Sequence, residues 1–130
     1  MKLCIPSSDS RGLQSEPAVE FGQAPFYTIV HLPTRHVQVV ANASKDLGSH
    51  ASCMGWRALH LAPGDEVIVR RIGRSAHRAL TRAGIGVRAT DATDVAEALE
   101  LYLDGRSRPV DAGELCCGCH HHAGVTEAEP

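Results

Sequence analysis

A β-branched run lies at positions 66–72, with no polar residue between Glu66 and Arg70. This pattern predicts a strand buried in the middle of a sheet. Small apolar residues then recur at helical spacing in the segment 73–84, and Gly84 is placed to end that helix. A second strand is expected at 85–90. Together these elements predict a βαβ unit with parallel strands and a right-handed crossover.

The rest of the chain predicts three more strands, two more helices and two polar loops. Strands are expected at 2–6, 26–32 and 35–41, the last two forming a hairpin whose second strand lies at a sheet edge. One helix is predicted from Ser49 or Ser52 to Ala62, and another from Asp94 to Gly105. Asp94 and Glu97 have the spacing of a capping box. The loops cover 11–25 and 42–49.

This order predicts an α/β fold in which a three-stranded meander and a parallel pair make a five-stranded mixed sheet with helices on its faces. Residues 1–105 form the predicted domain. Residues 106–130 show no periodicity and carry few apolar groups, so we expect a flexible Cys/His-rich tail unless a metal organises it.

Composition narrows the choice of partner. The formal net charge of -2 gives no indication of a polyanionic partner, and scarce aromatic residues supply a base-stacking surface poorly, so no nucleic acid is expected. The start of the chain lacks the apolar core of a signal peptide, and no segment is long enough to span a membrane. We therefore expect no membrane association, a cytoplasmic location and five reduced cysteines.

Four parts of the chain, taken in order, resemble the dinitrogenase iron-molybdenum cofactor biosynthesis family. They are the opening strand 1–6, the loop-to-strand segment 20–27, the strand-glycine-helix segment 67–76 with 80–85, and the closing helix 95–105. The resemblance covers roughly residues 1–105. It implies a three-layer ribonuclease H-like fold and a small accessory protein that carries nitrogenase cofactor or its precursors.

One position departs from the family pattern, which has histidine before the Phe-Gly pair where this chain has Glu20. A carboxylate is a harder ligand than imidazole and suits a thiophilic cluster less well. The resemblance therefore leaves two alternatives. Either Glu20 itself is the ligand, together with the loop around Gly22, or another residue has taken that role.

The tail contains a dense set of metal ligands: Cys116, Cys117, Cys119, His120, His121 and His122. Thiolates suit copper(I), zinc and iron-sulfur clusters, whereas imidazole suits zinc, copper, nickel and iron. We expect this run to gather metal or pass it to the cleft at the strand ends. The alternative is an adventitious metal-scavenging tail or an expression tag.

The cleft itself is expected beyond the carboxyl ends of the parallel strands, at Gly73 and the first helical turn with Arg74. Arg70, Arg71 and Arg74 around Gly73 are candidates for binding an anion. His77 follows one turn later. His50 and Cys53 are three residues apart at a predicted helix start, so both can meet one ion, although a small core cysteine and a solvated histidine are the more ordinary explanation.

These residues and the family resemblance together imply a non-catalytic binding or carrier protein for a metal-sulfur cluster or an iron-molybdenum cofactor precursor, with cluster donor and acceptor proteins as partners. An iron-sulfur or iron-molybdenum cluster is expected, and the metal is left open. A two-metal nuclease would need clustered carboxylates on the central strands, where the sequence offers only Glu66. The alternative is a protein-interaction or regulatory module whose tail binds metal incidentally.

Overall fold

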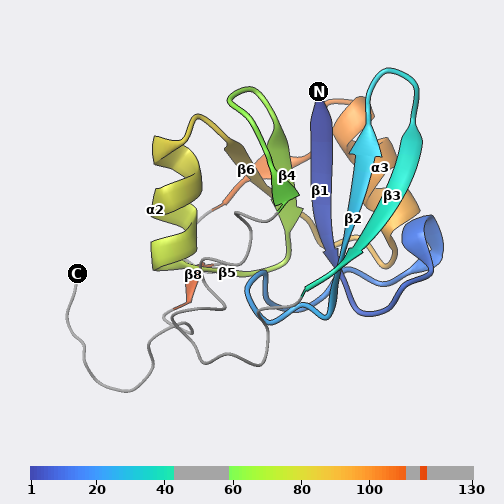
Figure 1. Cartoon of the computed structure of the whole chain (residues 1–130), viewed down its shortest axis with the longest axis horizontal. Coiled ribbons are helices and arrows are strands. Elements are labelled where there is room, and N and C mark those ends of the chain that lie inside the picture. The colour runs from blue at the N-terminus through green and yellow to red at the C-terminus, as the bar shows by residue number, and fades with distance from the viewer. Residues whose placement is uncertain (43–58, 111–114, 117–130) are drawn as a thin grey trace.

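A six-stranded mixed sheet runs through the computed structural model, and helices cover both of its faces (Figure 1). The structure describes residues 1–42, 59–110 and 115–116. The strand order is β3-β2-β1-β4-β6-β7. The strands are β1 (Lys2–Ser7), β2 (Phe26–His31), β3 (His36–Ala41), β4 (Glu66–Val69), β6 (Gly86–Ala89) and β7 (Arg108–Pro109).

A separate two-stranded sheet pairs β5 (Ile72–Gly73) with β8 (Leu115–Cys116). The described helices are α2 (Arg74–Arg82), α3 (Val95–Leu103) and the 3-10 turn η1 (Gly12–Gln14). Strand β1 lies between β2, which is antiparallel to it, and β4, which is parallel to it. The predicted hairpin is confirmed as β2–β3, with β3 at the edge, and the predicted parallel pair is β4–β6.

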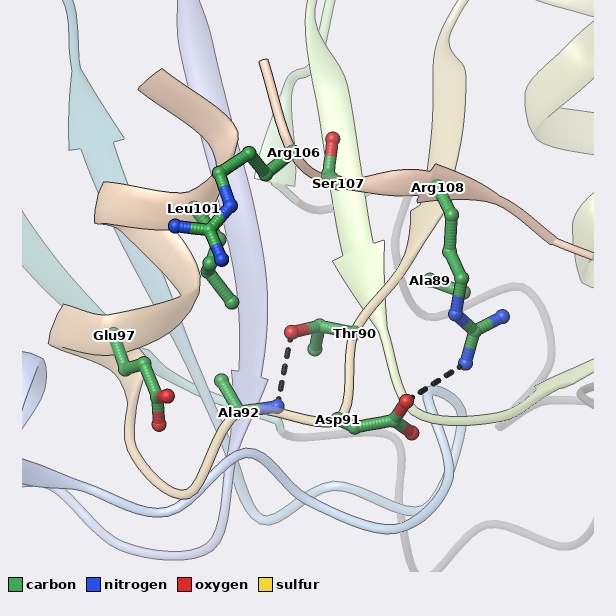
Figure 2. A pocket seen from close by; sticks show the side chains of 9 residues that line it. All are labelled: Ala89, Thr90, Asp91, Ala92, Glu97, Leu101, Arg106, Ser107 and Arg108. Atoms are coloured by element: carbon green, nitrogen blue, oxygen red, sulfur yellow. Dashed lines mark hydrogen bonds and ion pairs between the residues drawn. The ribbon is translucent and has the colours of Figure 1, made fainter. Parts of the chain in front are cut away.

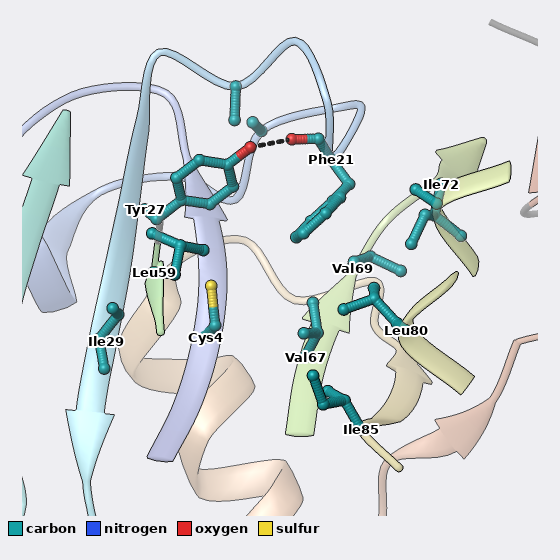
Figure 3. Close-up of a cluster of buried hydrophobic side chains, with 13 residues drawn as sticks. Cys4, Phe21, Tyr27, Ile29, Leu59, Val67, Val69, Ile72, Leu80 and Ile85 are labelled. Atoms are coloured by element: carbon teal, nitrogen blue, oxygen red, sulfur yellow. Dashed lines mark hydrogen bonds between the residues drawn. The ribbon is translucent and has the colours of Figure 1, made fainter. Parts of the chain in front are cut away.

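Neighbouring residues of the central strands serve opposite faces of the sheet. In β1, Cys4 belongs to the core under α2, whereas Leu3 and Ile5 belong to the core under α3. The first core buries Ala76 and Leu80 of α2 against the sheet. Figure 3 shows Leu80 beside Val67 and Val69 of β4. This alternation follows from the two-residue period of a strand, and it explains why β1 and β4 are apolar at nearly every position.

A local sequence signal ends helix α2 where it was predicted. Gly84 has a φ of 82°, and the N–H groups of Gly84 and Ile85 donate to the carbonyls of Thr81 and Leu80, which forms a Schellman motif after α2. An added Cβ at Gly84 would stand 3.1 Å from the Cβ of Pro63.

Helix α3 begins with the predicted cap. The Asp94 carboxylate accepts the backbone N–H of Glu97 at 2.8 Å. The Glu97 carboxylate reaches back to the N–H and the hydroxyl of Thr93, both at 2.9 Å. Gly105, with a φ of 72°, follows the helix and repeats the same hydrogen-bond pattern as at the end of α2.

The prediction of five strands in the sheet is wrong, because β7 adds a sixth. Two-residue strands carry no readable period, so neither β7 nor β8 could be recognised in the region 106–130. The predicted strand 66–72 is also broken into β4 and β5 at Arg70 and Arg71. Two consecutive arginines cannot both continue a strand that is buried on both faces.

The tail 106–130 lies partly outside the described residues, so its predicted flexibility stays a prediction. Its described parts, 106–110 and 115–116, include β7 and β8. The helix predicted between Ser49 and Ala62 falls largely on residues 43–58, which are also outside the described part. Leu59, at its described end, is buried in the core under α2.

Candidate cofactor-binding site

The loop that carries Glu20 and Gly22 is fixed to the end of β1. Ala18 donates its backbone N–H to the carbonyl of Pro6 at 2.8 Å, and an isolated bridge joins Ser7 to the same loop. The predicted loop 11–25 is therefore an ordered connection that returns to the strand it left. Long ordered loops are more often functional than short turns.

Phe21 ties this loop to the end of β4. Its backbone N–H donates to the Arg71 carbonyl at 3.1 Å, and its own carbonyl accepts the Tyr27 hydroxyl at 2.8 Å. The two rings pack with centroids 5.4 Å apart (Figure 3). Burial raises the pKa of Tyr27, so its hydroxyl stays a donor at neutral pH. The Asn42 amide donates to the Gly22 carbonyl at 3.2 Å and fixes the next residue.

The start of α2 presents positive charge. Gly73 is the N-cap, no side chain caps the first-turn N–H groups, and that turn contains no acidic residue. Arg71 and Arg74 beside it are exposed. Backbone N–H groups at a helix N-terminus together with cationic side chains favour an anion.

Strand β8 brings the tail to this helix start. In the parallel β5–β8 pair, Gly73 is in register with Cys116 and Ile72 with Leu115. The structure describes the backbone of Cys116, which begins the run of cysteines and histidines. The first residue of that run therefore lies beside the N-cap of α2, more than forty positions away in sequence.

The structure thus brings three predicted segments together. The Glu20–Gly22 loop meets the β4–β5 connection through Phe21, Gly73 and Arg74 follow that connection, and Cys116 pairs with Gly73. His77 lies one turn further along α2 and is half-buried.

The other predicted ligands lie outside the described residues: His50, Cys53, Cys117, Cys119, His120, His121 and His122. Within the described part of the chain, no three His, Cys, Asp or Glu side chains converge as a metal-binding group. Burial also raises the pKa of the Cys4 thiol, which is 0% exposed, so Cys4 stays a neutral core residue.

A hollow of about 340 Å³ opens beside Glu20. It is lined by Ser8, Ala18, Val19, Glu20, Gln23 and Pro25. Glu20 is half-buried, and Val19 is 59% exposed. The loop therefore offers one carboxylate at the rim of a mainly apolar depression.

Arg70 does not take part in the expected anion site. Its guanidinium donates to the carbonyl of Ala92 at 2.9 Å, and Ala92 belongs to the core under α3. The alternation of β4 explains the difference: Val69 belongs to the core under α2 and Ile68 to the core under α3, so Arg70 falls on the α3 face. Arg71 and Arg74 are the described arginines left at the helix start.

A second hollow, of about 300 Å³, was not predicted from the sequence (Figure 2). It lies at the carboxyl end of β6 and is lined by residues 89–92, by Glu97 and Leu101 of α3, and by residues 106–108. An ion pair of 3.2 Å joins Arg108 to Asp91 in it. Applying the strand-end rule to β6 as well as to β4 would have identified residues 90–92.

Comparison with known proteins supports one family. The family model described as dinitrogenase iron-molybdenum cofactor matches residues 1–105. No functionally curated protein matches the sequence. No helix of the described residues is long and apolar enough to cross a membrane.

Several solved structures have a similar fold. The apo form of the orange protein from Desulfovibrio gigas superposes with a TM-score of 0.71 at 23% identity, covering 85% of this chain and 92% of that one. A candidate NifB protein from Thermotoga superposes with a TM-score of 0.67 at 24% identity, covering 83% of this chain and 91% of that one. A candidate dinitrogenase from Methanocaldococcus jannaschii superposes with a TM-score of 0.59 at 14% identity, covering 85% of this chain and 94% of that one. At these identities the likeness shows the α/β fold alone.

Proposed function

The chain belongs to the dinitrogenase iron-molybdenum cofactor family, and from this premise we propose that it binds and carries a metal-sulfur cluster without catalysing a reaction. The cargo is an iron-sulfur or iron-molybdenum cluster, or a precursor of the iron-molybdenum cofactor. The cluster donor and acceptor proteins of cofactor assembly are its partners. Its binding site is the cradle made by the Glu20–Gly22 loop, the start of α2 and the tail that follows β8.

One observation carries this proposal: the pairing of Gly73 with Cys116 in the β5–β8 sheet. It supports a common site for two features that are far apart in sequence, the glycine-started helix and the cysteine-histidine run. A ligand run attached at the helix start is held at high local concentration there.

The residue types suit an anionic, sulfur-rich group. Cysteine thiolates are soft ligands, and the three tail cysteines supply them within four positions. The uncapped N–H groups of α2, with Arg71 and Arg74, supply positive charge for a cluster of negative net charge. Glu20 at the rim offers one hard oxygen ligand.

Anaerobic loading tests the proposal. The full chain is incubated with iron, sulfide and molybdate, desalted, and measured for bound metal and for visible absorption. We expect a stoichiometric chromophore in the wild type. The triple variant Cys116→Ser, Cys117→Ser and Cys119→Ser should lose most of it, because serine hydroxyls do not replace thiolates toward soft metals.

Two further variants sharpen the result. Cys4→Ala is the matched control, since it removes a buried thiol and should leave loading unchanged. Glu20→His restores the family ligand type and should raise the affinity for the cluster if this position is a ligand. Colourless, metal-free wild-type protein, or a triple variant that loads like Cys4→Ala, would contradict the carrier function.

The 59% exposure of Val19 beside the 340 Å³ hollow favours a second candidate, a protein-interaction or regulatory module with incidental metal binding by the tail. In that case Val19→Ser should abolish capture of a partner protein, while metal loading has no effect on capture.

We further infer a cytoplasmic location, because free thiolates need a reducing compartment. The three-layer ribonuclease H-like classification is also part of this proposal. It is supported by the placement of α2 and α3 on opposite faces of the sheet.

A further inference from the structure

Two histidines face each other across the β2–β3 hairpin. His31, the last residue of β2, is in register with His36, the first residue of β3. Their ring centroids are 5.6 Å apart, and the ring planes are tilted by 52°. His31 also pairs with Lys2 at the start of β1, whereas the Glu20 loop is attached at the other end of that strand. The histidine pair is therefore at the opposite end of the sheet from the candidate cofactor-binding site.

The separation of the rings is suited to a chelated ion. With metal-nitrogen bonds of about 2.0–2.1 Å, two imidazoles on one ion have ring centres roughly 5–6 Å apart. The observed 5.6 Å lies within this span. His36 is exposed and His31 half-buried, so an ion can reach them from solvent.

A neighbouring residue contacts one of the two rings. The Nε2 atom of His31 lies 3.3 Å from Oε1 of Gln38. In the tautomer in which Nε2 donates to this oxygen, Nδ1 keeps its lone pair and is available to a metal ion. Histidine ligands of metals commonly donate their second N–H in this way, which orients the ring.

Two nearby cationic side chains are engaged elsewhere. Lys2 donates its Nζ to the carbonyl of His60 at 3.0 Å, and Arg35 in the hairpin turn forms a 3.2 Å ion pair with Glu100. No third histidine, cysteine or carboxylate joins the pair among the residues that the structure describes. Water or a small ligand would complete the coordination, which keeps the ion exchangeable.

We propose that His31 and His36 form a two-histidine surface site for a borderline divalent cation such as Zn²⁺ or Ni²⁺. Imidazole is the ligand type that these ions prefer. The site is independent of the tail and of the proposed cluster cradle, so it stands or falls separately from the carrier function.

Nickel titration of the full chain, followed by the imidazole signals in NMR, tests the proposal. Paramagnetic Ni²⁺ should broaden the His31 and His36 signals together and with one midpoint. In His36→Ala, the midpoint for broadening of the His31 signal should move to at least about tenfold more Ni²⁺, because the second ligand no longer binds within the same molecule. The tail histidines give their own signals and are read separately.

His60→Asn is the matched control, because His60 is an exposed histidine outside the pair and asparagine tolerates its φ of 55°. This variant should leave the midpoint of His31 unchanged. An unchanged midpoint in His36→Ala, or broadening confined to the tail histidines, would overturn the two-histidine site.

Discussion

The Tyr27 hydroxyl offers a direct test of how the core positions the Glu20 loop. Tyr27 is 1% exposed, and its hydroxyl donates to the Phe21 carbonyl at 2.8 Å while accepting from the Asn42 amide at 3.2 Å. The change Tyr27→Phe keeps the ring and its packing. It leaves the Phe21 carbonyl without this donor in a place that water does not reach.

The expected cost follows from these contacts. Leaving a buried polar group unsatisfied costs about 1–3 kcal/mol. Asn42 keeps its bonds to Gly22 and to Ala24, the latter at 2.8 Å, so its amide adds little to the cost. We therefore expect Tyr27→Phe to lower the free energy of unfolding by about 1.5 kcal/mol.

Urea unfolding followed by circular dichroism measures this cost. With a slope of about 1.5 kcal/mol per molar, the midpoint should fall by about 1 M at an unchanged slope. Hydrogen exchange should also speed up at the Phe21 amide, whose acceptor is Arg71 at the β4–β5 connection.

Tyr102→Phe is the matched control, because this hydroxyl is half-buried, so water can take over its contacts with the Met1 sulfur at 3.9 Å and with Glu66. We expect a loss below about 0.5 kcal/mol. Equal losses in the two variants would refute the reasoning that the Tyr27 hydroxyl anchors the loop.

Other predictions concern the helix ends. Asp94→Ala should cost about 1 kcal/mol in urea unfolding, because it removes the α3 cap. Gly105→Ala should lower the free energy of unfolding by about 1 kcal/mol, because its backbone is left-handed. Gly84→Ala should cost more, because its new Cβ would also stand 3.1 Å from Pro63. A larger loss in Gly105→Ala than in Gly84→Ala would contradict this reasoning. Hydrogen bonds from Thr93 lower the pKa of Glu97 below its ordinary 4.5, so the stability this carboxylate contributes is present above that pH and is lost as the pH falls through the lowered pKa. Glu97→Gln should therefore flatten the acid limb of a stability-versus-pH curve, and identical acid limbs would contradict this origin.

Local signals predicted most of the fold. Gly84, Gly105 and Asp94 set helix ends through backbone geometry that depends only on nearby residues. The apolar runs of β1 and β4 identified the central strands because both faces of the sheet are covered.

Features set by distant contacts could not be predicted. Gly73 pairs with Cys116 between two strands of two residues each, which are too short to show a period in the sequence. Arg70 was expected among the anion-binding residues around Gly73, but its guanidinium donates to the carbonyl of Ala92 in the core under α3, a contact that only the tertiary structure reveals. At the candidate site, the positions of Glu20 and Gly22 near the helix start could be expected from the family resemblance. The hydrogen bond of Phe21 that fixes them could not.

The β5–β8 pair shares no strand with the six-stranded sheet. Few backbone hydrogen bonds join these two-residue strands, but Leu115 also packs against the core under α2, so undocking of β8 would uncover part of that core. The attachment of Cys116 beside the helix start is therefore coupled to the packing of the sheet beneath it.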